Sequence, residues 1–133
     1  MRLFLDTNIF LDLLFKREYE KEALIILNSI NKGVHEGILL DITLINIAYV
    51  ARKQKVDIEK FLNIILQNCY VVGANNQMAQ DALALRHSDF EDALQYISAK
   101  ETECDLIVTN DKRFYNGSLE VMRSNIFVEK FIG

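Results

Sequence analysis

The chain has 133 residues, of which half are hydrophobic and 26% are charged, with no proline and only five glycines. This length suits one domain with one core, and the composition excludes a disordered, collagen-like or long coiled-coil protein. Few turn-forming residues are available for a small all-β sandwich, so we expect helices to dominate. The formal net charge of -4 has the wrong sign for holding nucleic acid by charge alone, so such a role would need metal ions.

Two features of the sequence bear on its compartment. Cys69 and Cys104 are the only cysteines, and because they lack the spacing of a zinc site or a disulfide scaffold, we expect two reduced core residues. The apolar segment at residues 3–15 is interrupted by Asp6 and Asp12 and is followed by no small-residue cleavage site, so we expect neither a signal peptide nor a membrane span. The prediction is a protein of the reducing cytoplasm.

Short apolar runs alternate with helical periodicity along the chain, the pattern of buried parallel strands separated by helices. In chain order we expect a strand at 2–5, helices at 7–15 and 18–32, a strand at 38–40, helices at 42–53 and 57–66, a strand at 70–72, helices at 77–85 and 88–103, a strand at 106–108, a turn or short helix at 112–117 and an edge strand at 119–122. The tail beyond residue 122 receives no assignment. This alternation predicts a single α/β domain over residues 1–133, a three-layer α/β/α sandwich on a mainly parallel central sheet.

Several polar residues near helix starts have a capping interpretation. Ser88, with Glu91 three residues later, has the spacing of a capping box, and we interpret Glu91 mainly as part of that cap rather than as a ligand. For Asp89, a structural role at the helix start and a ligand role both remain open. Asp41 is interpreted as the cap of the helix that follows it.

Three further aspartates are candidates for a site. The expected capping box does not use Asp92, and the one structural role open to Asp6, capping its own helix, could be filled by Thr7 or Asn8. Asp6 follows the first predicted strand, Asp111 follows the fourth, and Asp92 lies in the first turns of the helix leading to that fourth strand. In open parallel sheets, ligands bind beyond the carboxyl ends of the strands. Convergence there would cost on the order of 4 kcal/mol per close pair at an effective dielectric of 20, so a cation must offset it. Oxygen ligands without His or Cys favour Mg²⁺ or Mn²⁺, which suit phosphodiester hydrolysis.

Two segments resemble the PIN domain ribonucleases, especially VapC-type toxins, and together the likeness spans nearly the whole chain. LFLDTNIFLDLLFKR at residues 3–17 resembles the family's first strand and Asp-Thr-Asn turn, and DFEDALQYISAKETECDLIVTNDKRF at 89–114 resembles its later helix and the strand ending in Thr-x-Asp. The resemblance implies a PIN-like fold. It also implies that Asp6, Asp92 and Asp111 are catalytic acids that hold the metal, that Thr109 lines the site and that Asp89 lies at its rim.

One position departs from the family pattern. The family usually carries a glutamate on the helix after the second strand, and the matching residue here is Asn46. An amide oxygen can coordinate a hard cation or hold a metal-bound water, but it cannot act as a base, and a less negative site should bind metal more weakly. A buried amide bonded to its neighbours is an equally open interpretation. Asp41 is a possible substitute for the missing acid, although we favour its capping role.

The functional hypothesis is a metal-dependent endoribonuclease that uses Mg²⁺ or Mn²⁺. In this hypothesis, Asn46 and Thr109 lie around the metal ligands and shape the site. The resemblance further implies the toxin of a toxin-antitoxin pair, inhibited by a small antitoxin protein and often a homodimer. The alternative is a catalytically weakened or inactive PIN-like module that binds RNA or a protein partner.

Basic and histidine residues carry weaker predictions. The basic pairs at 16–17 and 112–113 could contact RNA phosphates, whereas the group at 52–55 is interpreted as a solvated helix end. His35 and His87 have no evident triad partner and are expected at the surface or at helix ends.

Overall fold

The computed structural model, which describes residues 1–132, has a central sheet of five parallel strands in the order β3-β2-β1-β4-β5. The strands are β1 (Arg2–Leu5), β2 (Glu36–Leu40), β3 (Cys69–Val72), β4 (Leu106–Val108) and β5 (Glu120–Met122). The predicted α/β/α sandwich is confirmed, with the predicted edge strand paired to β4. Because every strand runs in the same direction, all five carboxyl ends meet at one edge of the sheet.

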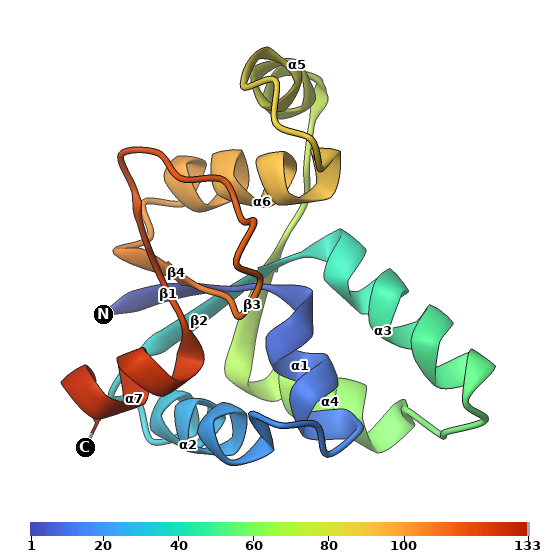
Figure 1. Cartoon of the computed structure of the whole chain (residues 1–133). Helices are drawn as coiled ribbons and strands as arrows, with labels where there is room; N and C mark the ends of the chain where they lie inside the picture. Colours follow the sequence, from blue (N-terminus) through green and yellow to red (C-terminus); the bar gives the residue numbers. More distant parts are fainter. Residues whose placement is uncertain (133) are drawn as a thin grey trace.

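Helices cover both faces of this sheet (Figure 1). They are α1 (Thr7–Leu14), α2 (Glu20–Asn31), α3 (Asp41–Lys53), α4 (Glu59–Asn68), α5 (Asn76–Ala84), α6 (Phe90–Glu101) and α7 (Ser124–Phe131). In the view shown, α5 and α6 lie above the sheet, while α1, α2, α4 and α7 lie below it. Each predicted strand and helix is found, with its ends within two residues of the predicted ones.

Side-chain alternation along the strands divides the core into two layers. On β1, Leu3 and Leu5 belong to the apolar cluster that includes α1, α2 and α7, whereas Phe4 belongs to the cluster beneath α5 and α6. On β4, Ile107 lies on the same side as Phe4. Successive residues of a strand face opposite sides, so a short run buried on both faces must be apolar throughout.

Two further expectations concern the cysteines and the membrane. Cys69 and Cys104 are both buried and unpaired, one in each apolar layer, which confirms the core assignment. Within residues 1–132, no helix combines the length and the apolar character needed to cross a bilayer.

The structure corrects three details of the predicted elements. The unassigned tail forms α7, whose Phe127 is fully buried against α2 and the sheet. Asp89, not Ser88, caps α6, because its side chain accepts a hydrogen bond from the Asp92 backbone N–H at 3.1 Å. Asp41 is already the first helical residue of α3 and makes no capping hydrogen bond with its side chain, since a cap must precede the first helical residue.

Candidate acidic functional site

An open pocket of about 290 Å³ lies at the carboxyl edge of the sheet and brings together most of the predicted site residues. Its polar lining includes Asp6, Asn46, Asp89, Glu91, Asp92 and Asp111; we call this set the acidic cup. The members come from the segments after β1 and β4, from α3 and from the start of α6. The three aspartates, distant in sequence, therefore do converge, with Asn46 and Asp89 beside them.

Asp6 is the most enclosed of these acids, with 2% of its surface exposed. Its Oδ2 accepts a hydrogen bond from the Thr109 hydroxyl at 2.7 Å, and its Oδ1 accepts one from the Gln95 amide at 3.0 Å. Burial raises the pKa of Asp6, and the two hydrogen bonds, which favour the charged form, oppose that rise. Asp6 occupies the N-cap position of α1, but its side chain makes no capping hydrogen bond to that helix.

Asp92 is buried at the start of α6 and lines the cup together with Asp111. Burial raises the pKa of Asp92 to about 8, and hydrogen bonding to Asp111 and the charge of Asp6 act in the same direction. The Oδ2 atom of Asp92 is buried and has no hydrogen-bond partner among the described residues. Its nearest basic group is Nε2 of His87, at 3.9 Å. A buried carboxylate oxygen without a donor is costly unless a cation or a proton satisfies it.

Thr109 connects two of the aspartates through one hydroxyl group. The hydroxyl donates to Asp6 and accepts the backbone N–H of Asp111 at 3.1 Å. Thr109 is itself buried, with 1% of its surface exposed. This one hydroxyl therefore helps to orient both the Asp6 carboxylate and the segment after β4.

Asn46 and Glu91 form a pair that the sequence did not predict. Asn46 is half-buried on α3 and donates from Nδ2 to Oε1 of Glu91 at 2.9 Å. Gln95, which is fully buried, donates to Oε2 of Glu91 at 3.4 Å and to Asp6. The predicted capping role of Glu91 is therefore wrong, because Asp89 takes the cap and the Glu91 side chain turns into the cup.

Gln95 is a site residue that the sequence analysis missed. It lies three residues after Asp92 and four after Glu91, so these three side chains share one face of α6. That helical spacing from Asp92 was the available signal. Glu91 has a raised pKa because of burial, which the hydrogen bond from Asn46 opposes.

The remaining candidates lie outside the cup. Asp41 is exposed and does not line the pocket. The basic pairs at 16–17 and 112–113 are exposed, and within residues 1–132 no lysine or arginine forms an ion pair with an acid of the cup. The expectation for His35 is wrong, because His35 is buried near the amino end of β2. His87 lies between α5 and α6, near helix ends as expected, with its side chain partly enclosed beside Asp92.

The carboxylates of the acidic cup do not form a closed metal site. In the described part of the chain, no group of three Asp, Glu, His or Cys side chains is close enough together to hold an ion. The donor set and the unpartnered buried Oδ2 of Asp92 nevertheless suit a hard divalent cation.

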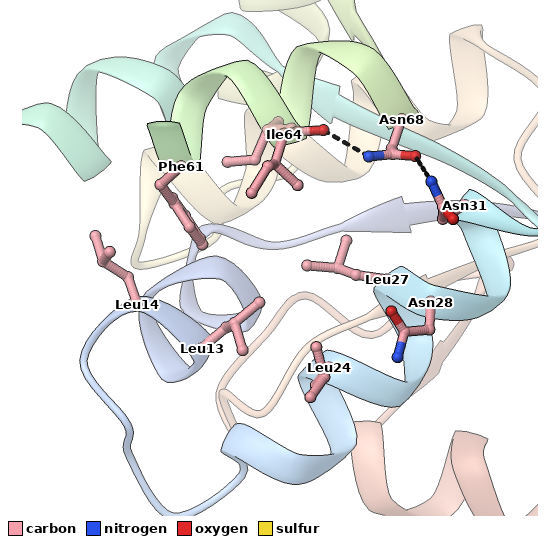
Figure 2. Close-up of a pocket in the computed structure, with 10 residues that line it drawn as sticks. Leu13, Leu14, Leu24, Leu27, Asn28, Asn31, Phe61, Ile64 and Asn68 are labelled. Carbon is pink, nitrogen blue, oxygen red and sulfur yellow. Dashed lines mark hydrogen bonds between the residues drawn. The ribbon is translucent and has the colours of Figure 1, made fainter. Parts of the chain in front are cut away.

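A second cavity, of about 380 Å³, has a different chemistry (Figure 2). It is an apolar groove between α1, α2 and α4, and its lining includes Leu13, Leu14, Leu24, Leu27, Phe61 and Ile64. At one end, Asn31 donates to Asn68 at 2.7 Å, and Asn68 donates to the backbone carbonyl of Ile64. We call this cavity the apolar groove.

The fold and the acidic cup together define an α/β protein with a carboxylate site of the kind that binds hard cations. The family described as "PIN domain" matches residues 3–118, and the chain therefore belongs to the PIN domain family. It is 26% identical to ribonuclease VapC1 of Aquifex aeolicus over 98% of this chain and 95% of that protein.

Two solved structures have a similar fold. A toxin-antitoxin complex from Klebsiella pneumoniae matches with a TM-score of 0.70 and 20% identity, covering 92% of this chain and 97% of that one. VapBC2 from Rickettsia felis, bound to a DNA fragment from its promoter, matches with a TM-score of 0.67 and 18% identity, covering 92% and 98%.

Proposed function

We propose that this protein is a metal-dependent endoribonuclease that hydrolyses RNA phosphodiester bonds. The observation that carries the proposal is the convergence of Asp6, Asp92 and Asp111 in one pocket that is lined by no lysine or arginine among the described residues. The similarity to ribonuclease VapC1 supports RNA as the substrate. Asp6, Asp92 and Asp111 are assigned as the catalytic acids.

The three aspartates would hold Mg²⁺ or Mn²⁺, which supplies an activated water and stabilises charge on the phosphodiester oxygens. Thr109 and Gln95 fix the orientation of the Asp6 carboxylate. Mutation of residues that hydrogen-bond to a metal ligand in this way typically lowers metal affinity or activity by about 10- to 100-fold. The exposed basic residues at 112–113, next to Asp111, can contact the flanking RNA phosphates and position the substrate without reading its bases.

The proposed setting is a toxin-antitoxin pair in the cytoplasm, with a small antitoxin protein as partner and a homodimer as the toxin's own state. The similarity of the fold to two toxin-antitoxin assemblies supports this partner. The apolar groove is the surface that we assign to the antitoxin, because Leu24 and Ile64 in it are about half exposed and an apolar segment of a partner would cover them. A short gene immediately upstream would identify that partner, and Leu24→Glu should weaken its co-purification with this chain.

The test of the enzyme uses purified protein and a structured RNA. Cleavage should occur with Mn²⁺, stop with EDTA, and be absent in Asp6→Asn, a variant that keeps the shape of the side chain but removes its charge. Cleavage that survives both chelation and the substitution would contradict the mechanism.

The alternative is a PIN-like module that binds RNA or a protein without cutting. Asn46 favours it, because an amide replaces a charge that the family usually places on this helix. Binding of RNA with no metal-dependent cleavage of any RNA tried would support this alternative.

A further inference from the structure

The position of Glu91 in the acidic cup has a consequence beyond the three predicted acids. Both of its carboxylate oxygens accept hydrogen bonds from side-chain amides, Oε1 from Asn46 at 2.9 Å and Oε2 from Gln95 at 3.4 Å. Two donors from different helices hold it in one orientation, toward the pocket that it lines. A surface glutamate in the first turn of a helix, stabilised only by the helix dipole, would need neither donor.

The amide of Gln95 places Glu91 close to the centre of the cup. The same Nε2 atom donates to Glu91 and, at 3.0 Å, to Oδ1 of Asp6, so the two carboxylates lie within reach of one NH₂ group. Gln95 is fully buried, and Asp92, on the same helix, lines the same pocket and has a buried Oδ2 atom without a hydrogen-bond donor among the described residues. The cup therefore has a fixed acid near Asp6 and an unsatisfied acceptor beside it.

The residue at position 46 makes this arrangement possible. A glutamate there would place a second carboxylate beside that of Glu91, a like-charge contact that disfavours the ionised form of both groups. An asparagine instead donates a hydrogen bond. Asparagine in place of glutamate at position 46 and the inward orientation of Glu91 thus depend on each other. As a result, α6 provides the carboxylate that α3 lacks.

We propose that Glu91 is a fourth acidic ligand group for the divalent cation of the cup and that Asn46 and Gln95 are its positioning residues. The inference rests on the proposed function, because it assumes that Asp6, Asp92 and Asp111 bind a cation. It replaces the expectation that the asparagine leaves the site one charge short: the charge is present, on the neighbouring helix.

The experiment measures Mn²⁺ binding by calorimetry on the full chain, with RNA cleavage as a second readout. Glu91→Gln keeps the size of the side chain and should weaken Mn²⁺ binding by about 10- to 100-fold. Glu101→Gln is the matched control, because it removes the same charge from the exposed far end of α6, and its affinity should equal that of the unmodified protein.

A double variant, Asn46→Glu with Glu91→Gln, tests whether the pair acts as a unit. It exchanges carboxylate and amide, so the net charge is unchanged and the hydrogen bond can form in the opposite direction. Its Mn²⁺ affinity should recover to within about threefold of the unmodified protein, the behaviour of two coupled neighbours. The exchange also keeps the test decisive if Glu91→Gln alone does not fold.

The outcomes separate the two proposals. If Asp6→Asn abolishes Mn²⁺ binding while Glu91→Gln binds like the unmodified protein, the assignment of Glu91 is wrong and the proposed enzyme stands. If Glu91→Gln lowers only the melting temperature, Glu91 is a structural residue and the inference is again wrong. If the unmodified protein binds no Mn²⁺, the proposed function fails together with the inference.

Discussion

The charged residues at the two ends of the same parallel sheet differ in their exposure and in their partners. At the amino end, Arg2 pairs with Glu36 at 3.0 Å, and its backbone N–H donates to Asp105, all in contact with solvent. At the carboxyl end, Asp6 and Asp92 are almost completely buried, and no described lysine or arginine pairs with them. At the amino end the charges pair with one another, while at the carboxyl end only His87 approaches Asp92, at 3.9 Å. Buried acids with raised pKa values cluster at functional sites.

The largest expected effect is on activity at the carboxyl end. Asp92→Asn removes a proposed metal ligand while keeping its shape, so RNA cleavage in Mn²⁺ should fall on the order of 1000-fold, since a metal contributes several kcal/mol of transition-state stabilisation. The melting temperature in EDTA should stay the same or rise, because a buried acid without a donor has been removed. Loss of both activity and stability would show instead that Asp92 is a structural residue.

Thr109→Val should have the next largest effect. Valine matches the shape of threonine but cannot donate to Asp6 or accept the N–H of Asp111. Mn²⁺ affinity should fall about 10- to 100-fold, and the free energy of unfolding, measured by urea denaturation, should fall by about 1 to 3 kcal/mol. Thr109→Ser retains the hydroxyl and should restore most of both quantities. Unchanged Mn²⁺ affinity in the valine variant would contradict this role.

The buried acids at the carboxyl end should make the stability of the protein depend on pH. The pKa of Asp92 is about 8 in the folded chain against an ordinary 3.8, so between these values the folded protein keeps a proton that the unfolded chain has released. The free energy of unfolding of the metal-free protein should therefore decrease as the pH rises through this range, and the raised pKa values of Asp6 and Glu91 act in the same direction.

Mn²⁺ should oppose this loss of stability, since it replaces the proton on the acids. Melting temperatures in EDTA and in Mn²⁺, compared at about pH 5 and about pH 8, should differ more at the higher pH. Asp92→Asn should flatten the EDTA curve. A metal-free stability that increases steadily over this range would mean that the cup acids are ionised without a cation.

The order of elements could be predicted because it depends on local patterns. Strands buried on both faces need uninterrupted apolar runs, and the helices between them show periodicity near 3.6 residues. The helix α7 received no assignment, because the residue that precedes it, Arg123, gives no capping signal to mark its start. Its first residue, Ser124, is instead anchored by the side chain of Asn110 through two hydrogen bonds of 3.0 Å, a contact between segments that no local pattern reveals.

The acidic cup was predictable to the extent that strand ends specify it. Asp6 and Asp111 follow predicted strands, and Asp92 was identified because the expected cap did not use it. Glu91 was assigned to the cap because its spacing from Ser88 matches a capping box, and local spacing cannot show that Asp89 takes that cap instead. The partnership of Glu91 with Asn46 joins two helices 45 residues apart, so it depends on tertiary packing.

The smallest expected effect lies at the amino end of the sheet. Arg2→Ala removes an exposed ion pair with Glu36 and the hydrogen bond from the Arg2 guanidinium to the backbone carbonyl of Thr102. Exposed pairs of this kind contribute little, since water already solvates both charges. The melting temperature should fall slightly, more at low salt than at high salt, while Mn²⁺ affinity and RNA cleavage stay unchanged. A substantial loss of Mn²⁺ affinity in this variant would show that the two ends are coupled through β1, and the acidic cup would then depend on charges at the opposite edge of the sheet.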